Sequence, residues 1–176
     1  MAIEYELQVL DINEDEIRWK LKQIWAEFVS EKFMKRWVFS MNEETQEWIR
    51  LRDDWNKVTI TYKKRWSVEV WNTEEIEVVV DDFDKAAEML GKLHFYEKRF
   101  YQENKRELHK LGDTEFAIDS WPKIPPYLEI ESTSKEEVER YFKVLELEWH
   151  ANWDFWSIRI YDRYGLDIHS FEILKF

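Results

Sequence analysis

Short stretches of alternating apolar and polar residues recur along this chain, and each predicts a β-strand with one apolar face. In residues 3–10, IEYELQVL, every odd position is apolar, whereas Glu4, Glu6 and Gln8 stand at the even ones. The further strand-like stretches are 32–39, 47–53, 58–65, 74–80, 101–111, 114–120 and 127–132. The opposite faces of most of these stretches carry charged side chains.

Between the strands, apolar residues at helical spacing predict helices over 13–29, 81–93 and 134–147. Asn13 is a plausible cap of the first helix, and Ser134 with Glu137 forms a capping box for the third. The tail from Trp149 onward is mixed, with a turn expected at Gly165. The order strand, helix, three strands therefore occurs twice.

This order predicts an α+β fold made of two similar halves. Each half opens with Glu-x-Glu, at Glu4 and Glu6 and again at Glu75 and Glu77. Eight mostly antiparallel strands with polar residues on one face can close into a barrel, which removes the exposed edges. We expect a single domain over residues 1–176, an eight-stranded tunnel barrel with flanking helices and a polar interior.

Composition narrows the class of protein. The chain has 176 residues, 44% of them hydrophobic, and a formal net charge of -12, which makes a nucleic-acid partner improbable. It has no cysteine, so disulfides, thiolate metal sites and a cysteine nucleophile are excluded. No long apolar run predicts a membrane span, and the acidic N-terminus lacks signal-peptide features, so a cytoplasmic location is expected.

The polar strand faces supply the candidate chemistry. A solvated sheet face would alternate in the same way, but the repetition over so many strands favours a lined interior. Closure would gather the basic residues Arg50, Arg52, Lys63 and Arg106 as anion donors. It would also gather the carboxylates Glu4, Glu6, Glu75, Glu77, Glu115, Asp119, Glu129 and Glu131. Carboxylates bind hard cations such as Mg²⁺ or Mn²⁺, and the combination suits a polyphosphate bound through a metal.

Several motifs resemble one known family. Glu4-x-Glu6, WIRLR, TITYK, EEIEV and above all YQENKRE with IDSWPKIPPYLEIE resemble the class IV adenylyl cyclase-like branch of the CYTH superfamily. That superfamily also includes thiamine triphosphatases and inorganic triphosphatases. The resemblance implies an eight-stranded antiparallel tunnel in which basic residues bind a triphosphate and acids hold a divalent metal.

The resemblance also implies residue roles. Metal-side acids would be Glu4, Glu6, Asp119, Glu129 and Glu131, and phosphate-side groups would be Arg50, Arg52, Lys63 and Arg106. Glu75 and Glu77 would position those bases or the metal. The catalytic set would be Glu4, Glu6, Lys63 and Arg106, with Trp48, Asn104 and Glu115 as further tunnel residues.

Four tunnel positions depart from the family pattern. Gln8 stands where the opening motif ExExK has a cation, Val79 where a third acid is usual, Leu108 where a base is expected and Ala117 where an acid is expected. The chain also has 11 Trp and only 3 Gly, and Trp25, Trp55 and His94 stand where relatives commonly have glycine. Most of the tryptophans are expected to pack in the core.

These departures leave three interpretations. The favoured one is a small-molecule-binding tunnel altered, by divergence or by engineering, toward a less charged and more aromatic ligand. The alternative is a working metal-dependent triphosphate hydrolase or class IV adenylyl cyclase-like enzyme, which would need Mg²⁺ or Mn²⁺. The third is a stability variant without a ligand. The expected partner is a small molecule, and the chain could be a monomer or a homodimer.

Overall fold

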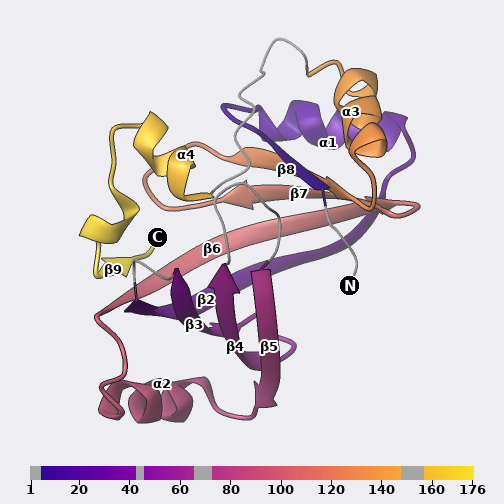
Figure 1. Cartoon of the computed structure of the whole chain (residues 1–176). Coiled ribbons are helices and arrows are strands. Elements are labelled where there is room, and N and C mark those ends of the chain that lie inside the picture. The colour runs from indigo at the N-terminus through magenta and orange to yellow at the C-terminus, as the bar shows by residue number, and fades with distance from the viewer. Residues whose placement is uncertain (1–4, 43–45, 66–72, 148–156) are drawn as a thin grey trace. The chain divides into compact units, whose positions relative to one another are not determined.

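The computed structural model describes residues 5–42, 46–65, 73–147 and 157–176, which form two compact units (Figure 1). Unit 1 comprises Met1–Lys32 and Lys105–Ile168, and unit 2 comprises Phe33–Asn104 and His169–Phe176. Two long strands contribute residues to both units. The expectation of one domain over residues 1–176 stays a prediction.

The order of elements repeats strand, helix, three strands, as the sequence predicts. The first half is β1 (Tyr5–Val9), α1 (Glu14–Gln23), β2 (Glu27–Asn42), β3 (Glu47–Asp53) and β4 (Val58–Arg65). The second half is β5 (Thr73–Val80), α2 (Phe83–Lys92), β6 (Lys98–Leu111), β7 (Thr114–Ser120) and β8 (Tyr127–Ser132). The helices α3 (Lys135–Val144) and α4 (Ser157–Arg163), the 3₁₀ turn η2 (Ile168–Ser170) and β9 (Ile173–Leu174) follow.

The eight main strands form one sheet in the order β1-β8-β7-β6-β2-β3-β4-β5, with β9 paired in parallel to β6. The antiparallel sheet confirms the predicted fold class, but the predicted closure into a barrel is wrong. Among the described residues β1 and β5 end the sheet and no pairing joins them. Alternating residues specify which face of a strand is apolar, whereas closure depends on strand tilt and stagger, which that pattern does not encode.

The apolar face of the strands in unit 1 packs under α1 and α3. Its core contains Leu7 and Val9 of β1, Leu128 and Ile130 of β8, and Phe142 of α3, all of them buried. Fully burying such side chains contributes about 1.5–3 kcal/mol each. The even-numbered residues of β1 and the odd-numbered residues of β8 are therefore left on the opposite, polar face.

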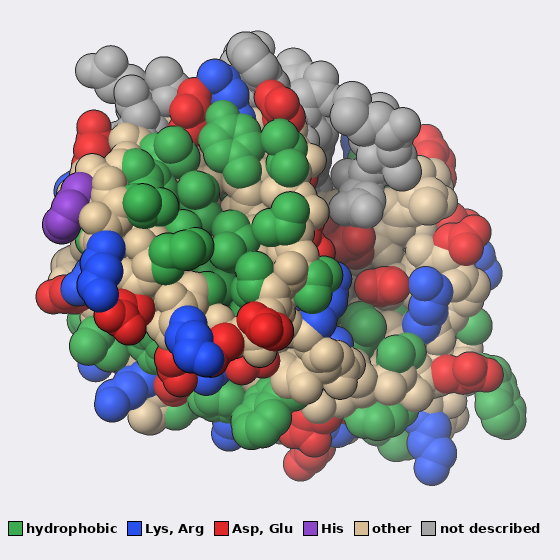
Figure 2. Space-filling model, turned by 90° about the horizontal axis from the view of Figure 1, so that it is seen from below, with side chains coloured by type: hydrophobic (Ala, Val, Ile, Leu, Met, Phe, Trp, Pro, Cys, Tyr) green, Lys and Arg blue, Asp and Glu red, His purple; other side chains and the backbone are tan. Residues whose placement is uncertain are grey.

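In unit 2 the apolar face packs against α2 in the same way. Phe39 of β2 and Leu51 of β3 contact a cluster that includes Phe83, Ala86 and Leu90 of α2. Figure 2 shows hydrophobic side chains gathered on the lower face of the molecule as Figure 1 is drawn. Large exposed apolar side chains of unit 2 include Met89 and Leu93 of α2 and Ile76 and Val78 of β5.

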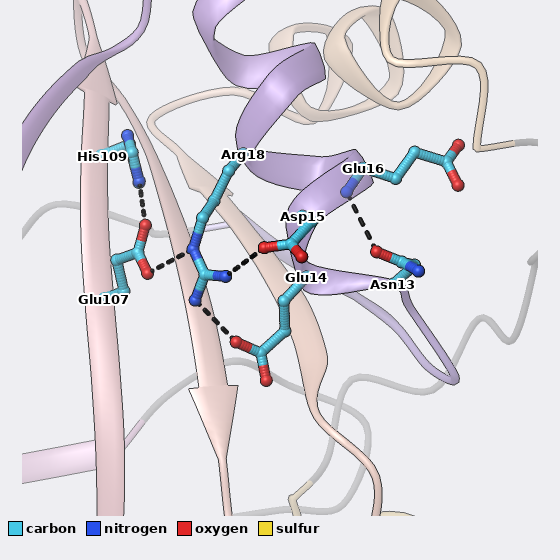
Figure 3. Close-up of polar contacts among 7 residues, drawn as sticks. All are labelled: Asn13, Glu14, Asp15, Glu16, Arg18, Glu107 and His109. Carbon is cyan, nitrogen blue, oxygen red and sulfur yellow. Dashed lines mark hydrogen bonds and ion pairs between the residues drawn. The ribbon is translucent and has the colours of Figure 1, made fainter.

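A polar contact cluster ties α1 to β6 within unit 1 (Figure 3). Arg18 donates from Nε to Glu107 Oε2 at 2.8 Å and also pairs with Glu14 at 2.6 Å and Asp15 at 3.0 Å. The other oxygen of Glu107 lies 2.7 Å from Nε2 of His109. Burial opposes ionisation of Glu107, but the hydrogen bonds from His109 and Arg18 prevail and lower its pKa. Every one of these groups has a partner, so the cluster reads as a structural support for α1.

The first helix ends earlier than predicted. It stops at Gln23, and Phe28, which fits the helical spacing, lies in β2 with 60% of its surface exposed. The cause is a Schellman ending, in which the Ala26 amide donates to the Leu21 carbonyl and the Trp25 amide to the Lys22 carbonyl. Periodicity alone does not reveal this ending, because Trp25 occupies the position that usually carries glycine.

Three helix ends in unit 1 share this geometry but differ in the residue with positive φ. That residue is Trp25 (φ 63) after α1, Glu146 (φ 53) after α3 and Gly165 (φ 68) after α4. The turn expected at Gly165 is therefore confirmed. Trp55 and His94 also have positive φ, at 70 and 50, so the three glycine-like positions identified in the sequence do need the conformation that glycine adopts most easily.

We expect Trp25→Gly to raise the free energy of unfolding by about 1 kcal/mol, since a non-glycine residue in this conformation costs roughly 1–2 kcal/mol. Trp25 is 83% exposed, so its removal sacrifices little burial. Glu146→Gly should act similarly, whereas Trp25→Ala keeps the Cβ and should give no gain. Gly165→Ala should lower the free energy of unfolding, because it adds backbone strain at a positive φ. The added Cβ meets no atom within 4 Å, so no packing contact would offset this strain. Urea unfolding of the four variants measures these differences; equal stability of Trp25→Gly and Trp25→Ala would contradict the explanation.

In the described part of the chain, no helix has the length and apolar character needed to cross a membrane.

Candidate functional site

The polar face of unit 1 brings three carboxylates together. The antiparallel register places Glu6 of β1 opposite Glu131 of β8, and Gln8 opposite Glu129. Ligand oxygens of Glu6, Glu129 and Glu131 all lie within 4.8 Å of one another. We call these three residues the acidic trio. Like charges this close repel, and carboxylate oxygens in such an arrangement suit a hard divalent cation.

Gln8 is the fourth member of this arrangement and is buried, with 2% of its surface exposed. Its Nε2 donates to Glu129 Oε2 at 3.3 Å. Its Oε1 is also buried and has no hydrogen-bond partner among the described residues. A buried acceptor without a partner costs roughly 1–3 kcal/mol. The oxygen-only donor set, including this amide oxygen, fits a hard cation.

Arg106 of β6 neutralises part of the negative charge. Its Nε donates to Asp119 Oδ1 at 2.9 Å, and its terminal nitrogen donates to Asp119 Oδ2 at 2.5 Å and to Glu129 Oε1 at 2.9 Å. Burial opposes the charge, but Glu129 and Asp119 raise the pKa of the guanidinium well above its usual value. Asp119 is fully buried against Arg106 and lies outside the acidic trio, so its role as a metal ligand stays a prediction.

The two apolar substitutions in unit 1 are partners. Leu108 of β6 lies directly opposite Ala117 of β7. The resemblance places a base at residue 108 and an acid at residue 117. Both members of a cross-strand ion pair are therefore replaced by apolar residues here. The next pair on this face keeps its charges: Lys110 Nζ lies 3.1 Å from Glu115 Oε1. Loss of both signs at once therefore leaves the net charge of the face unchanged.

Cationic side chains gather on the polar face of unit 2. Arg52 of β3 lies opposite Arg36 of β2, and Arg50 follows it on the same face. Lys63 of β4 lies opposite Trp48, one pair beyond the pairing of Arg50 with Thr61. We call Arg36, Arg50, Arg52 and Lys63 the basic group. Trp48 shares their face and is partly exposed, and its role as a ligand-binding residue stays a prediction.

Two acids of β5 serve this basic face. Glu75 forms an ion pair with Lys63. Glu77 accepts from Lys57 Nζ at 2.9 Å and from Thr61 Oγ1 at 3.0 Å, and these contacts lower its pKa. For Lys63, burial and the charge of Arg50 lower the pKa despite Glu75. Burial and the neighbouring positive charge of Arg50 therefore both disfavour the charged form of Lys63.

The candidate site residues predicted from the sequence omit two residues of the polar face in unit 2. Arg36 donates to Asn104 Oδ1 at 3.4 Å, and Asn104 is buried, with 2% exposed. A pairing of β2 with β3 that sets the apolar residues Phe39 and Ile49 opposite each other would have aligned Arg36 with Arg52. Thr59 is the second: its hydroxyl is buried without a partner among the described residues, opposite Arg52 and Val79. Val79 itself is 69% exposed.

The remaining predictions concern Glu4 and the tryptophans. Glu4 lies outside the described residues. The expectation that most tryptophans pack in the core is wrong for Trp19, Trp25 and Trp55, which are 61%, 83% and 75% exposed. Trp121 is buried. The exposed tryptophans therefore add aromatic area to the outer surface.

A comparison with known proteins identifies the family. The CYTH domain model matches residues 39–150. This chain belongs to the CYTH domain family. A proposed adenylate cyclase of Methanocaldococcus jannaschii is 31% identical to this CYTH chain over 149 residues, covering 82% of the chain and 84% of the relative.

Solved structures match the fold of this CYTH chain. A Pyrococcus horikoshii protein has a TM-score of 0.71 at 23% identity, covering 85% of this chain and 94% of its own. A proposed adenylyl cyclase from Hippeastrum, described as having a dominant triphosphatase activity, has a TM-score of 0.60 at 14% identity, covering 94% and 97%. At these identities the similarity establishes the fold alone.

Proposed function

We propose that this CYTH domain is a divalent-metal-dependent enzyme that cleaves a phosphoanhydride bond of a triphosphate. The observation that carries the proposal is the acidic trio, since three carboxylates whose oxygens lie within 4.8 Å of one another form a donor set that suits a divalent cation. Glu6, Glu129 and Glu131 would hold this cation, and Arg106 would orient Glu129. The bound cation would act as a Lewis acid, neutralising charge on the phosphate oxygens.

The basic group of unit 2, taken by itself, offers donors that suit phosphate oxygens. Arginine presents planar paired donors that match phosphate, and Lys63 adds a point charge. Burial and the positive charge of Arg50 lower the pKa of Lys63, and a bound polyanion would offset that positive charge, which favours a highly charged substrate. The buried Thr59 hydroxyl would donate a further hydrogen bond. Positioning of the phosphates is the main protein contribution to phosphoryl transfer.

The nucleophile separates two reactions of the same class. Water would give hydrolysis, and a ribose hydroxyl would give cyclisation of a nucleoside triphosphate. The name of the Methanocaldococcus jannaschii relative points to cyclisation, and the description of the Hippeastrum protein points to hydrolysis. We favour hydrolysis, because it requires binding of the triphosphate alone and no surface for a base and sugar.

A second candidate function is binding of a less charged, more aromatic ligand. Gln8 and the apolar pair Leu108 and Ala117 favour it, because each removes charge from the polar face. The exposure of Trp25 and Trp55 counts against it, because these tryptophans lie on the outer surface. The survival of the acidic trio and the basic group makes triphosphate chemistry the better supported function.

The test is turnover of tripolyphosphate and of ATP with Mn²⁺, with Mg²⁺ and with EDTA. At metal concentrations that saturate both proteins, we expect the unmodified chain to release phosphate in a metal-dependent reaction, more slowly than a Gln8→Lys, Leu108→Arg double variant. One charge-assisted hydrogen bond contributes roughly 1.5–3 kcal/mol, equivalent to about one to two decades in rate if it forms only in the transition state.

The products identify the reaction. Formation of cyclic AMP from ATP would show that the reaction is cyclisation and not hydrolysis. Absence of turnover and of tripolyphosphate binding in the chain, with binding restored in the double variant, would overturn the proposal in favour of the altered-ligand function. Trp25→Gly serves as the matched control, because this exposed residue lies outside the acidic trio and the basic group.

A further inference from the structure

We propose that Gln8 is itself a ligand of the divalent cation, so that unit 1 binds the cation in the absence of any polyphosphate. The inference rests on the proposed function in one respect: the acidic trio is taken as the cation site. It adds a fourth oxygen donor, and it makes cation binding the step that precedes substrate binding.

The first argument is the state of the Gln8 amide. Its oxygen is buried and has no hydrogen-bond partner among the described residues, while its nitrogen donates to Glu129. Buried polar atoms are nearly always paired, and an orphaned one calls for an explanation such as an ion. Amide carbonyl oxygens are regular ligands of hard cations, beside carboxylates.

The second argument is position. Gln8 follows Glu6 by two residues on β1 and lies opposite Glu129 on β8, so its side chain shares the face of the acidic trio. The amide nitrogen already approaches Glu129 Oε2 to 3.3 Å. The terminal torsion of a glutamine is broad and roughly two-fold. A half-turn about it exchanges the amide nitrogen and oxygen, and turns the oxygen toward a cation bound at Glu129.

The third argument is charge. Arg106 donates to Glu129 at 2.9 Å, so a full positive charge already borders the trio. A cation at residue 8 would add a second positive charge and would repel a bound metal. A neutral amide instead supplies a ligand without repulsion. Gln8 therefore shifts the site toward metal binding and away from direct phosphate binding.

The experiment is a titration of the full chain with Mn²⁺ in the absence of phosphate. Electron paramagnetic resonance measures the concentration of free Mn²⁺ at each step. We expect one site in the native chain and a roughly tenfold weaker Kd in Gln8→Leu, which removes the oxygen without changing the charge. Gln8→Lys should weaken binding further. Gln102→Leu is the matched control, since Gln102 is also buried but lies on β6 in unit 2.

Circular dichroism and the metal-free melting temperature show whether each variant folds. If Gln8→Leu does not fold, nuclear magnetic resonance of the native chain gives an independent readout. Bound Mn²⁺ must broaden the side-chain amide signal of Gln8. Equal Mn²⁺ affinity of folded Gln8→Leu and native chain, an unbroadened amide signal, or Mn²⁺ binding only after tripolyphosphate is added would each overturn the inference. Each of these results would leave the proposed triphosphate turnover standing. Conversely, absence of turnover in a chain that binds Mn²⁺ would overturn the proposed function alone.

Discussion

Replacement of Arg106 by methionine is expected to lower the free energy of unfolding by about 3 kcal/mol, the lower end of the range for removing one partner of a buried ion pair, because the side chain of Arg106 is 34% exposed. Arg106 donates two hydrogen bonds to Asp119, whose side chain is fully buried, and one to Glu129, whose side chain is 10% exposed. Without the guanidinium, Asp119 must lose its main partner or take up a proton. Urea unfolding at neutral pH measures the change.

The partner substitution provides the control. In the double variant Arg106→Met, Asp119→Leu no buried carboxylate remains at residue 119, so much of the lost stability should return. Arg140→Met is the matched exposed case. Arg140 is 60% exposed and pairs with Glu137 at 3.1 Å on α3, so its loss should cost less than about 1 kcal/mol. An equal cost for Arg106→Met and Arg140→Met would show that Asp119 does not depend on Arg106.

The two faces of the strands could be predicted from sequence because a strand alternates with period two. Leu7 and Val9 are buried under helices, whereas Glu6 and Gln8 lie opposite Glu131 and Glu129 on the other face. The acidic trio follows from this alternation once β1 and β8 are paired. The family resemblance grouped Glu6 with Glu129 and Glu131, but the pairing of β1 with β8 comes from the structure, since no local pattern links residues so far apart in the chain.

Other features could not be predicted because they depend on tertiary contacts or on backbone geometry. The partnership of Leu108 with Ala117 requires the register of β6 and β7. The end of α1 requires knowledge that Trp25 takes a positive φ. The ion pair of Asp119 with Arg106 depends on the reach of the arginine side chain from the neighbouring strand. The sequence identifies the residues of the polar face, but the side-chain contacts determine which acid pairs with which base.

Substitution of Glu131 by glutamine should reduce metal-dependent hydrolysis of tripolyphosphate by at least about a hundredfold, which corresponds to roughly 3 kcal/mol of lost transition-state stabilisation. Glutamine has nearly the same size but carries no charge, so the cation would lose one anionic ligand. Glu131 is a better choice than Glu129, because Glu129 also accepts from Arg106 and Gln8 and its replacement would disturb the buried pair.

The measurement is kcat and KM for tripolyphosphate over a range of Mn²⁺ concentrations. If Glu131 binds the cation, raised Mn²⁺ should restore part of the lost activity, since weaker binding is overcome by mass action. Glu139→Gln is the matched control: Glu139 lies on α3, partly exposed, and pairs with Lys135 at 3.5 Å. Activity of Glu131→Gln equal to that of Glu139→Gln at every Mn²⁺ concentration would exclude Glu131 from the cation site. A loss that Mn²⁺ cannot relieve would instead assign Glu131 a role toward the substrate, because only a defect in metal affinity responds to metal concentration.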